Sequence, residues 1–189
     1  AGKGRGVVLR MTSLEEITRK VRICRNCDLA LMRTQAVPGE GNPRAAIMFI
    51  GEAPGAVEDE TGRPFVGAAG QFLDAMLADI GLQRTDVFIA NIAKCRPPGN
   101  RDPLPDEIDA CLPWLRAQIQ AINPQVICTL GRFAMTALIN PTLQISKVHG
   151  QPVEKDGVLY IPLFHPAAAL HQQSLRDTLI ADMRTVRDL

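Results

Sequence analysis

Short apolar runs alternate with longer amphipathic segments along most of the chain. The apolar runs are rich in β-branched and aromatic residues and end at glycine or a polar residue, which is typical of buried strands. They cover residues 46–50, 86–91, 126–131 and 158–164. The amphipathic segments repeat their apolar residues with a helical period and cover residues 13–22, 68–80, 105–122, 132–138 and 174–186. This alternation predicts an α/β fold, a three-layer α/β/α arrangement around a central, mainly parallel four-stranded sheet.

Two of the predicted helices carry signals at their first residues. Ser13 has Glu16 three residues later, the pattern of a capping box, and Pro105 occupies a first turn. The first predicted strand ends at Gly51 and is followed by a segment that we interpret as a loop with acidic residues at 56–60. Ligands of open α/β sheets bind outside the carboxyl ends of the strands, so we expect residues 51–67 to form the active-site loop.

Length and composition favour one domain. The 189 residues, 46% of them hydrophobic, suffice for one complete core, which we place at residues 13–189. We interpret residues 1–12 as a flexible N-terminal arm or an expression remnant. No apolar run has the length of a membrane span and residues 1–10 lack a signal-peptide core, so we expect a cytoplasmic protein without a membrane partner.

Charge and glycine patterns narrow the ligand classes. The net charge of +1 does not identify a partner, but basic residues are concentrated before residue 34. That end could face a polyanion or be a solvated face with a basic arm, and both interpretations stay open. Neither a Gly-x-Gly-x-x-Gly motif after the first strand nor a Gly-Lys-Ser/Thr motif is present, which argues against a dinucleotide fingerprint and a phosphate loop.

Four of the five cysteines are candidate metal ligands. Disulfides are rare in cytosolic proteins, and Cys24 and Cys27 form a C-x2-C pair that could share an ion or a cluster. Cys95 and Cys111 lie in a proline-rich segment and a predicted helix, whereas Cys128 lies within a predicted strand and is expected in the core. Zinc ribbons normally use two C-x2-C pairs, and an iron–sulfur cluster suits this spacing somewhat better. Spacing alone leaves both open.

Three predicted strands end in polar side chains, namely Glu52, Asn91 and His165. The carboxyl ends of parallel strands meet at one edge, so these groups are expected to be neighbours. An asparagine amide donates and accepts side by side, which matches O4 and N3–H of a base, and a histidine can donate to an oxygen that gains charge. Phe65 could supply a stacking plane, although core packing is the stronger interpretation for its ring.

Several long motifs occur together in one order. They are Gly-Glu-Ala-Pro-Gly at 51–55 followed by Glu-Asp at 58–59, Gly-Arg-Pro-Phe-Val-Gly at 62–67, Asn-x-x-Lys-Cys-Arg-Pro-Pro-x-Asn-Arg at 91–101, the four-cysteine spacing, and His-Pro at 165–166. Together they resemble the iron–sulfur (family 4) uracil-DNA glycosylases, from Cys24 to the final helix.

The resemblance implies a monofunctional base-excision repair enzyme. Such an enzyme flips deoxyuridine out of single- or double-stranded DNA and cleaves the N-glycosidic bond, leaving an abasic site. We expect a monomer that works on nucleoid DNA in the cytoplasm. The resemblance also implies a [4Fe–4S] cluster, chiefly structural, held by Cys24, Cys27, Cys95 and Cys111.

Matching positions suggest roles for individual residues. The resemblance implies that Phe65 stacks on uracil, Asn91 reads its polar edge, and His165 stabilises negative charge on O2. Glu58 matches the carboxylate that crowds position 5 and rejects the methyl group of thymine. Leu170 is expected to be the wedge that fills the gap left in the base stack.

The turn at 51–54 departs from the better-known uracil glycosylases, which have Gly-Gln-Asp-Pro with an aspartate that positions water. Ala53 stands in the place of that aspartate. We therefore expect Ala53 to contribute to the base site and Glu52 to orient water or act electrostatically. A related iron–sulfur group binds uracil-DNA covalently through a histidine in an inserted loop. Residues 100–102 contain no histidine, so no cross-linked product is expected.

Two other functions remain as alternatives. A non-catalytic, metal-stapled nucleic-acid-binding module would bind DNA in a salt-sensitive way that is indifferent to uracil. A small electron-transfer protein would show a reversible redox couple without DNA. The electron-transfer alternative gives no reason for the combination of Phe65 and Glu58.

Overall fold

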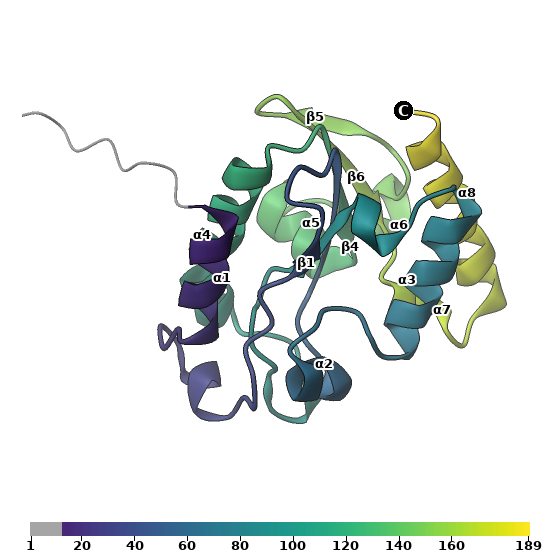
Figure 1. Ribbon diagram of the computed structural model, residues 1–189. Coiled ribbons are helices and arrows are strands. Elements are labelled where there is room, and N and C mark those ends of the chain that lie inside the picture. The colour runs from purple at the N-terminus through teal and green to yellow at the C-terminus, as the bar shows by residue number, and fades with distance from the viewer. Residues whose placement is uncertain (1–12) are drawn as a thin grey trace, which may run out of the picture.

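The computed structural model describes residues 13–189, in which one six-stranded sheet lies between helices (Figure 1). The strand order is β1-β3-β2-β4-β6-β5. The strands are β1 (Glu40–Gly41), β2 (Ile47–Gly51), β3 (Phe88–Asn91), β4 (Val126–Leu130), β5 (Val153–Lys155) and β6 (Val158–Leu163). The arm expected at residues 1–12 lies outside the described residues.

The four predicted strands form the parallel centre of the sheet, which confirms the predicted α/β class. Strand β2 pairs in parallel with β3 and β4, and β4 pairs in parallel with β6. Two further strands, β1 and β5, add antiparallel edges. Both are too short to give a periodic pattern, so four strands were predicted where the sheet has six.

The helices come close to their predicted bounds, apart from several short ones that were not predicted. The structure contains α1 (Leu14–Arg22), α2 (Ala56–Thr61), α3 (Ala68–Asp79), α4 (Pro105–Ile122), α5 (Arg132–Leu138), α6 (Ile145–Val148), α7 (Pro166–Ala169) and α8 (Gln173–Arg187). Short 3₁₀ turns are η1 (Asp28–Leu31), η2 (Arg84–Asp86) and η3 (Pro98–Asn100). The Ser13 hydroxyl accepts from the Glu16 backbone N–H at 3.3 Å, so the predicted N-cap is confirmed.

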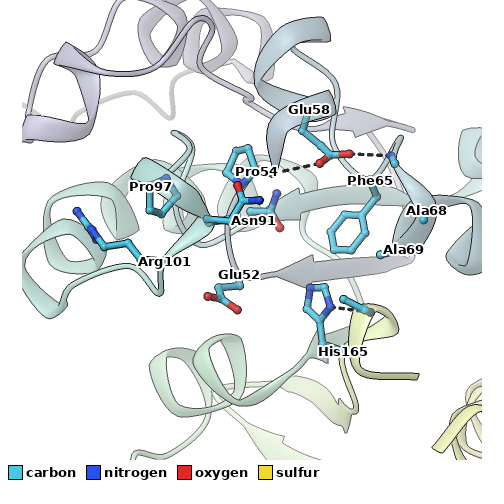
Figure 2. Close-up of a pocket in the computed structure, with 16 residues that line it drawn as sticks. Glu52, Pro54, Glu58, Phe65, Ala68, Ala69, Asn91, Pro97, Arg101 and His165 are labelled. Atoms are coloured by element: carbon cyan, nitrogen blue, oxygen red, sulfur yellow. Dashed lines mark hydrogen bonds between the residues drawn. The ribbon is translucent and has the colours of Figure 1, made fainter. Parts of the chain in front are cut away.

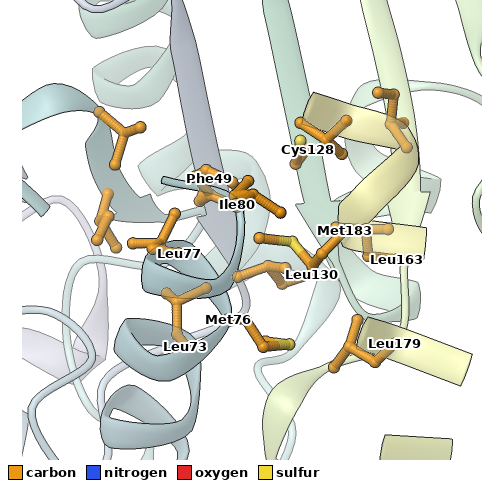
Figure 3. Close-up of a cluster of buried hydrophobic side chains, with 14 of the residues drawn as sticks. Phe49, Leu73, Met76, Leu77, Ile80, Cys128, Leu130, Leu163, Leu179 and Met183 are labelled. Carbon is orange, nitrogen blue, oxygen red and sulfur yellow. The ribbon is translucent and has the colours of Figure 1, made fainter. Parts of the chain in front are cut away.

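Two apolar clusters separate the sheet from its helices. Phe49 of β2 faces the cluster built with α3 and α8 (Figure 3). The flanking Met48 and Ile50 face the opposite cluster, which includes α4 and α5. Such alternation along a fully buried strand is expected of a parallel sheet covered on both faces. Cys128 is fully buried in the first cluster, which confirms its assignment to the core.

Helix α1 packs on α4 through a third, smaller cluster. Ile17 and Val21 are buried there beside Leu29 and Trp114. This packing brings the end of α1, with Cys24 and Cys27 after it, next to α4 (Figure 1).

The predicted acidic loop at residues 56–60 is wrong, because these residues form helix α2. Gly55 caps the helix, Glu58 accepts from the Gly55 N–H at 3.1 Å, and Gly62 ends it with φ +75°. Asp59 is buried and accepts from the backbone of Thr34 at 2.8 Å. Not every carboxylate of this segment therefore projects into solvent.

Strand register determines where the polar strand ends lie. Gly51 pairs with Asn91 across β2 and β3, and Leu130 pairs with Leu163 across β4 and β6. The residues that follow these strands therefore emerge at one edge. Within residues 13–189, no helix combines the length and the apolar character needed to cross a membrane.

Candidate active site

A pocket of about 290 Å³ opens at the carboxyl edge of the parallel strands (Figure 2). This volume suits one small planar ring. The structure brings together six of the residues that the sequence singled out, which line this pocket: Glu52, Ala53, Glu58, Phe65, Asn91 and His165. They come from β3 and from the segments after β2 and β6.

Asn91 ends β3 with its amide buried beneath the pocket. Its side chain is 2% exposed, and its Oδ1 has no hydrogen-bond partner among the residues that the structure describes. Gly51 makes room for this amide, since a Cβ on Gly51 would lie 2.7 Å from Asn91 Oδ1 and 2.4 Å from the Phe65 ring. A buried polar oxygen without a partner is costly, and a ligand N–H would satisfy it.

His165 follows β6 and caps the short helix α7. Its Nδ1 accepts from the Ala167 backbone N–H at 3.0 Å, which places the proton of the neutral ring on Nε2. Burial lowers the pKa of His165 to about 4. At neutral pH the ring is therefore an uncharged imidazole whose Nε2–H is the available donor.

Phe65 belongs to the core and to the pocket at once. It is 7% exposed and packs in the cluster of α3 and α8, yet it also lines the pocket. Its ring lies 5.6 Å from the His165 ring, between centroids, at an interplanar angle of 29°. Figure 2 shows the Phe65 ring above His165 and to the side of Asn91. Its backbone φ of +49° is unusual for a residue with a side chain.

The Glu58 carboxylate joins the two segments that flank the pocket. Besides the Gly55 N–H, it accepts from the N–H groups of Val66 at 3.0 Å and Gly67 at 2.7 Å. Three backbone donors on one carboxylate hold helix α2 and the Phe65 loop in one arrangement.

Glu52 lies at the mouth of the pocket, directly after β2. Burial is the main cause of the raised pKa of Glu52, and the nearby Asp102 carboxylate raises it further. The Arg132 guanidinium acts in the opposite direction. Ala53 also lines the pocket and contributes no polar side-chain atom. Glu52 is therefore the carboxylate that this turn offers to a reaction at the pocket.

One predicted residue stays outside the pocket, and the two pocket residues with polar side chains that were missed are Asn100 and Arg101. Leu170 lies half-buried at the C-terminal end of α7 and does not line the pocket. Asn100 and Arg101 do line it, because the proline-rich segment folds back over the edge of the sheet. The sequence could have pointed to Asn100 and Arg101, because both are polar residues within the motif at 91–101. Arg101 also pairs with Glu107, with Nη1 to Oε1 at 2.7 Å.

The four candidate metal-ligating cysteines line a second cavity, between α1, the segment after β3, and α4. Cys24, Cys27, Cys95 and Cys111 face it together with Trp114. Within residues 13–189, no three His, Cys, Asp or Glu side chains are close enough to share a single metal ion.

Nitrogen donors surround the thiol sulfurs. Trp114 Nε1–H donates to Cys24 Sγ at 3.2 Å, Arg33 Nη1–H to Cys95 Sγ at 3.1 Å, and the Lys94 backbone N–H to Cys111 Sγ at 3.1 Å. Burial raises the pKa of Cys111 to about 11. N–H donors aimed at sulfur stabilise thiolate, the form in which cysteine binds metal, so this donor set fits a metal cluster.

Lys94 links the cysteine cavity to the pocket. Its side chain is buried, and Nζ donates to the Asn91 carbonyl at 2.9 Å and to Gln118 Oε1 at 2.7 Å. Gln118 in turn donates to the Pro38 carbonyl at 2.7 Å. The end of β3 is thereby connected to α4, which carries Cys111.

Comparison with known proteins gives a consistent family. The family model described as "Uracil DNA glycosylase superfamily" matches residues 38–184. A type-4 uracil-DNA glycosylase of Sulfurisphaera tokodaii is 49% identical, over 95% of this chain and 86% of the relative. Proteins of the same name from Archaeoglobus fulgidus and Thermotoga maritima are 48% and 44% identical, over 95% and 92% of this chain and 94% and 93% of the relatives.

The matched region spans all of the parallel strands and every residue of the pocket. The relatives extend the likeness to nearly the full length of both chains. The chain belongs to the uracil DNA glycosylase superfamily and, within it, to the type-4 uracil-DNA glycosylases.

Proposed function

We propose that this protein excises uracil from single- and double-stranded DNA by hydrolysing the N-glycosidic bond, and that it leaves an abasic site for base-excision repair. The observation that carries this proposal is the unpartnered Oδ1 of Asn91, buried in a base-sized pocket beside an aromatic ring and a neutral imidazole. Neither a passive DNA-binding module nor an electron-transfer protein requires such an oxygen.

Recognition of the flipped base uses the two sides of one amide. Asn91 Oδ1 accepts N3–H of uracil, and its Nδ2 donates to O4. Cytosine presents a donor at position 4 and an acceptor at N3, so the same amide orientation disfavours it. Phe65 supplies the plane on which the base stacks.

Bond cleavage separates charge, and the pocket residues lie where that charge develops. The C1′–N1 electron pair moves to uracil, and His165 Nε2–H donates to O2 as that oxygen becomes negative. The Glu52 carboxylate favours the positive sugar and orients the water whose oxygen bonds to C1′. The proton that this water loses passes to the carboxylate and balances the proton that the uracil anion takes up as it leaves as the free base. Each contact is stronger in the transition state than with bound substrate, as catalysis requires.

Two further roles concern selectivity and DNA. Glu58 lies in the pocket wall with its carboxylate held by three N–H groups, a rigid obstacle to a methyl group at position 5.

Leu170 follows the helix that His165 caps, and its position supports the role of a wedge in the vacated base stack. The protein acts as a monomer in the cytoplasm and leaves no cross-linked product.

Cys24, Cys27, Cys95 and Cys111 would hold a [4Fe–4S] cluster. The shared cavity and the N–H donors to sulfur support this assignment. When bound, the cluster supplies a rigid covalent junction between segments and takes no part in the excision chemistry. Iron and sulfide analysis of the brown protein tests it, with four of each expected per chain.

The test of the activity uses purified protein, excess chelator, and single-stranded and duplex oligonucleotides that carry one uracil. Alkali then breaks any abasic site. We expect cleavage at the uracil alone and a loss of roughly 10²–10³-fold in rate for His165→Ala, the size expected for a donor to a developing anion. Cluster-loaded protein that leaves the uracil strand intact would contradict the proposal.

A further inference from the structure

The unusual backbone of Phe65 requires an explanation, because this residue is the proposed stacking plane. A positive φ is uncommon outside glycine, and it persists only where neighbouring groups hold it. Phe65 at φ +49° follows Pro64 and precedes the segment bound by Glu58. The aim of its ring into the pocket depends on this conformation.

Arg84 binds the carbonyls on both sides of the strained residue. Its Nη1–H donates to the Phe65 carbonyl at 2.9 Å, and its Nη2–H to the Pro64 carbonyl at 2.6 Å. Arg84 lies in η2, after α3, and only 18% of its side chain is exposed. A planar guanidinium presents its donors in a fixed geometry, so two successive carbonyls bound to it are fixed relative to each other.

Two carboxylates hold the guanidinium in turn. Glu40 Oε1 accepts from Arg84 Nη2 at 2.8 Å, and Asp74 Oδ1 accepts from Arg84 Nη1 at 3.1 Å. Glu40 belongs to the edge strand β1 and Asp74 to α3, so the position of Arg84 is set by the sheet and by a helix.

The same peptide is confined on its remaining sides. A Cβ on Gly70 would lie 1.8 Å from the Phe65 carbonyl oxygen, so only glycine allows α3 to approach this closely. Glu58 binds the next two N–H groups, of Val66 and Gly67. Arg84 therefore binds carbonyl groups of this loop, whereas Glu58 binds its N–H groups.

We propose that Arg84 is a positioning residue for base stacking: it holds the Pro64–Phe65 carbonyls so that the Phe65 ring forms one wall of the uracil pocket. This inference rests on the proposed function, since it concerns the same site. Arg84 does not line the pocket and touches no substrate.

Arg63 offers a matched control. It also donates to Glu40, through Nη2 to Oε1 at 2.8 Å and Nε to Oε2 at 2.9 Å, but it makes no contact with the Phe65 carbonyl. Arg63→Met and Arg84→Met therefore each remove one partner of Glu40, whereas only Arg84→Met removes the donors to the Pro64 and Phe65 carbonyls. Arg84→Lys keeps a charge but lacks the planar group that spans two carbonyls.

The experiment measures kcat and KM on a uracil oligonucleotide, inhibition by free uracil, and affinity for a uracil-free oligonucleotide. For Arg84→Met we expect uracil inhibition and kcat/KM to weaken roughly tenfold, within the range of one lost base stack, with uracil-free affinity unchanged. Arg63→Met should stay within about twofold of wild type, and Arg84→Lys should fall near Arg84→Met. Combining Phe65→Ala with Arg84→Met should add little to Phe65→Ala alone.

The outcomes separate the two proposals. If Arg84→Met does not fold, the same three measurements are made on Arg84→Lys instead. Arg84 variants that match Arg63→Met in uracil inhibition, or effects that add fully to Phe65→Ala, would overturn the positioning role while leaving uracil excision intact. A wild-type protein without uracil excision would instead overturn the proposed function.

Discussion

At the scale of single residues, His165 shows how the fold sets a protonation state. Burial lowers its pKa from 6.5 to about 4, and Nδ1 already accepts from Ala167 N–H. The folded protein therefore keeps His165 neutral between these two pH values, where the unfolded chain takes up a proton. The stability that this group contributes is complete above pH 6.5 and decreases as the pH falls toward 4.

NMR titration of labelled histidines tests this protonation state. We expect the His165 ring to stay neutral, with the proton on Nε2, down to about pH 4. The variant His165→Gln assigns the signal. A His165 resonance that titrates near 6.5 would show that the ring is charged over part of the working range, contrary to the proposed donor.

Glu52 is the residue whose role depends most on charge alone. Glu52→Gln keeps the size of the side chain and removes the carboxylate that we propose orients water. We expect single-turnover cleavage to fall by on the order of 10²-fold with inhibition by free uracil unchanged. Full single-turnover cleavage by Glu52→Gln would remove this role.

Residues at strand ends could be placed from the sequence, because parallel strands bring their carboxyl ends to one edge. Glu52, Asn91 and His165 do line one pocket. Arg84 and Arg101 were not anticipated as neighbours of the site. The placement of Arg84 depends on how its loop returns to the sheet, which no local pattern encodes, whereas Arg101 was signalled by its polar type within the 91–101 motif.

At the scale of elements, helix α2 is the main difference from the sequence prediction. The acidic residues suggested a loop, yet Glu58 binds three N–H groups and thereby stabilises both the helix and the Phe65 segment. The bond to Gly55 is a local helix cap, whereas the bonds to Val66 and Gly67 reach outside the helix and stabilise it beyond local preference. The edge strands β1 and β5 escaped prediction for the same reason, since they exist only through pairing with β3 and β6.

Removal of the Glu58 carboxylate should therefore loosen two segments. We expect Glu58→Ala to lower the free energy of unfolding by about 1–3 kcal/mol, because buried N–H groups lose their acceptor. Urea denaturation measures this change, and Glu60→Ala, an exposed neighbour on α2, is the matched control. Equal stability of the two variants would contradict the bridging role.

Rapid thymine release by the wild-type protein would contradict the proposed rejection of the thymine methyl group by Glu58.

The cysteine cavity makes a separate prediction at this scale. Trp114 donates to Cys24 Sγ from within α4. Trp114→Phe keeps an aromatic ring but removes that donor, so we expect a lower reduction potential of the bound cluster with excision unchanged. Protein-film voltammetry gives the potential. A potential equal to that of the wild type would argue against this hydrogen bond.

At the scale of the whole molecule, the sheet aligns the strand ends and the helices hold the loops around them. The periodic pattern was sufficient for the three layers and their parallel centre, because strand and helix periods differ clearly. The cysteine cavity and the pocket are joined through Lys94, which donates to the carbonyl of Asn91.

The central claim is that the strand-end pocket releases uracil as a free base. The most direct measurement is single-turnover quantification of free base from two matched duplexes, one with uracil and one with thymine, for wild type and Asn91→Ala. We expect one equivalent of uracil, no thymine, and a uracil rate reduced by on the order of 10²-fold in Asn91→Ala. Uracil release at the wild-type rate by Asn91→Ala, or binding of the uracil duplex without release, would contradict the account.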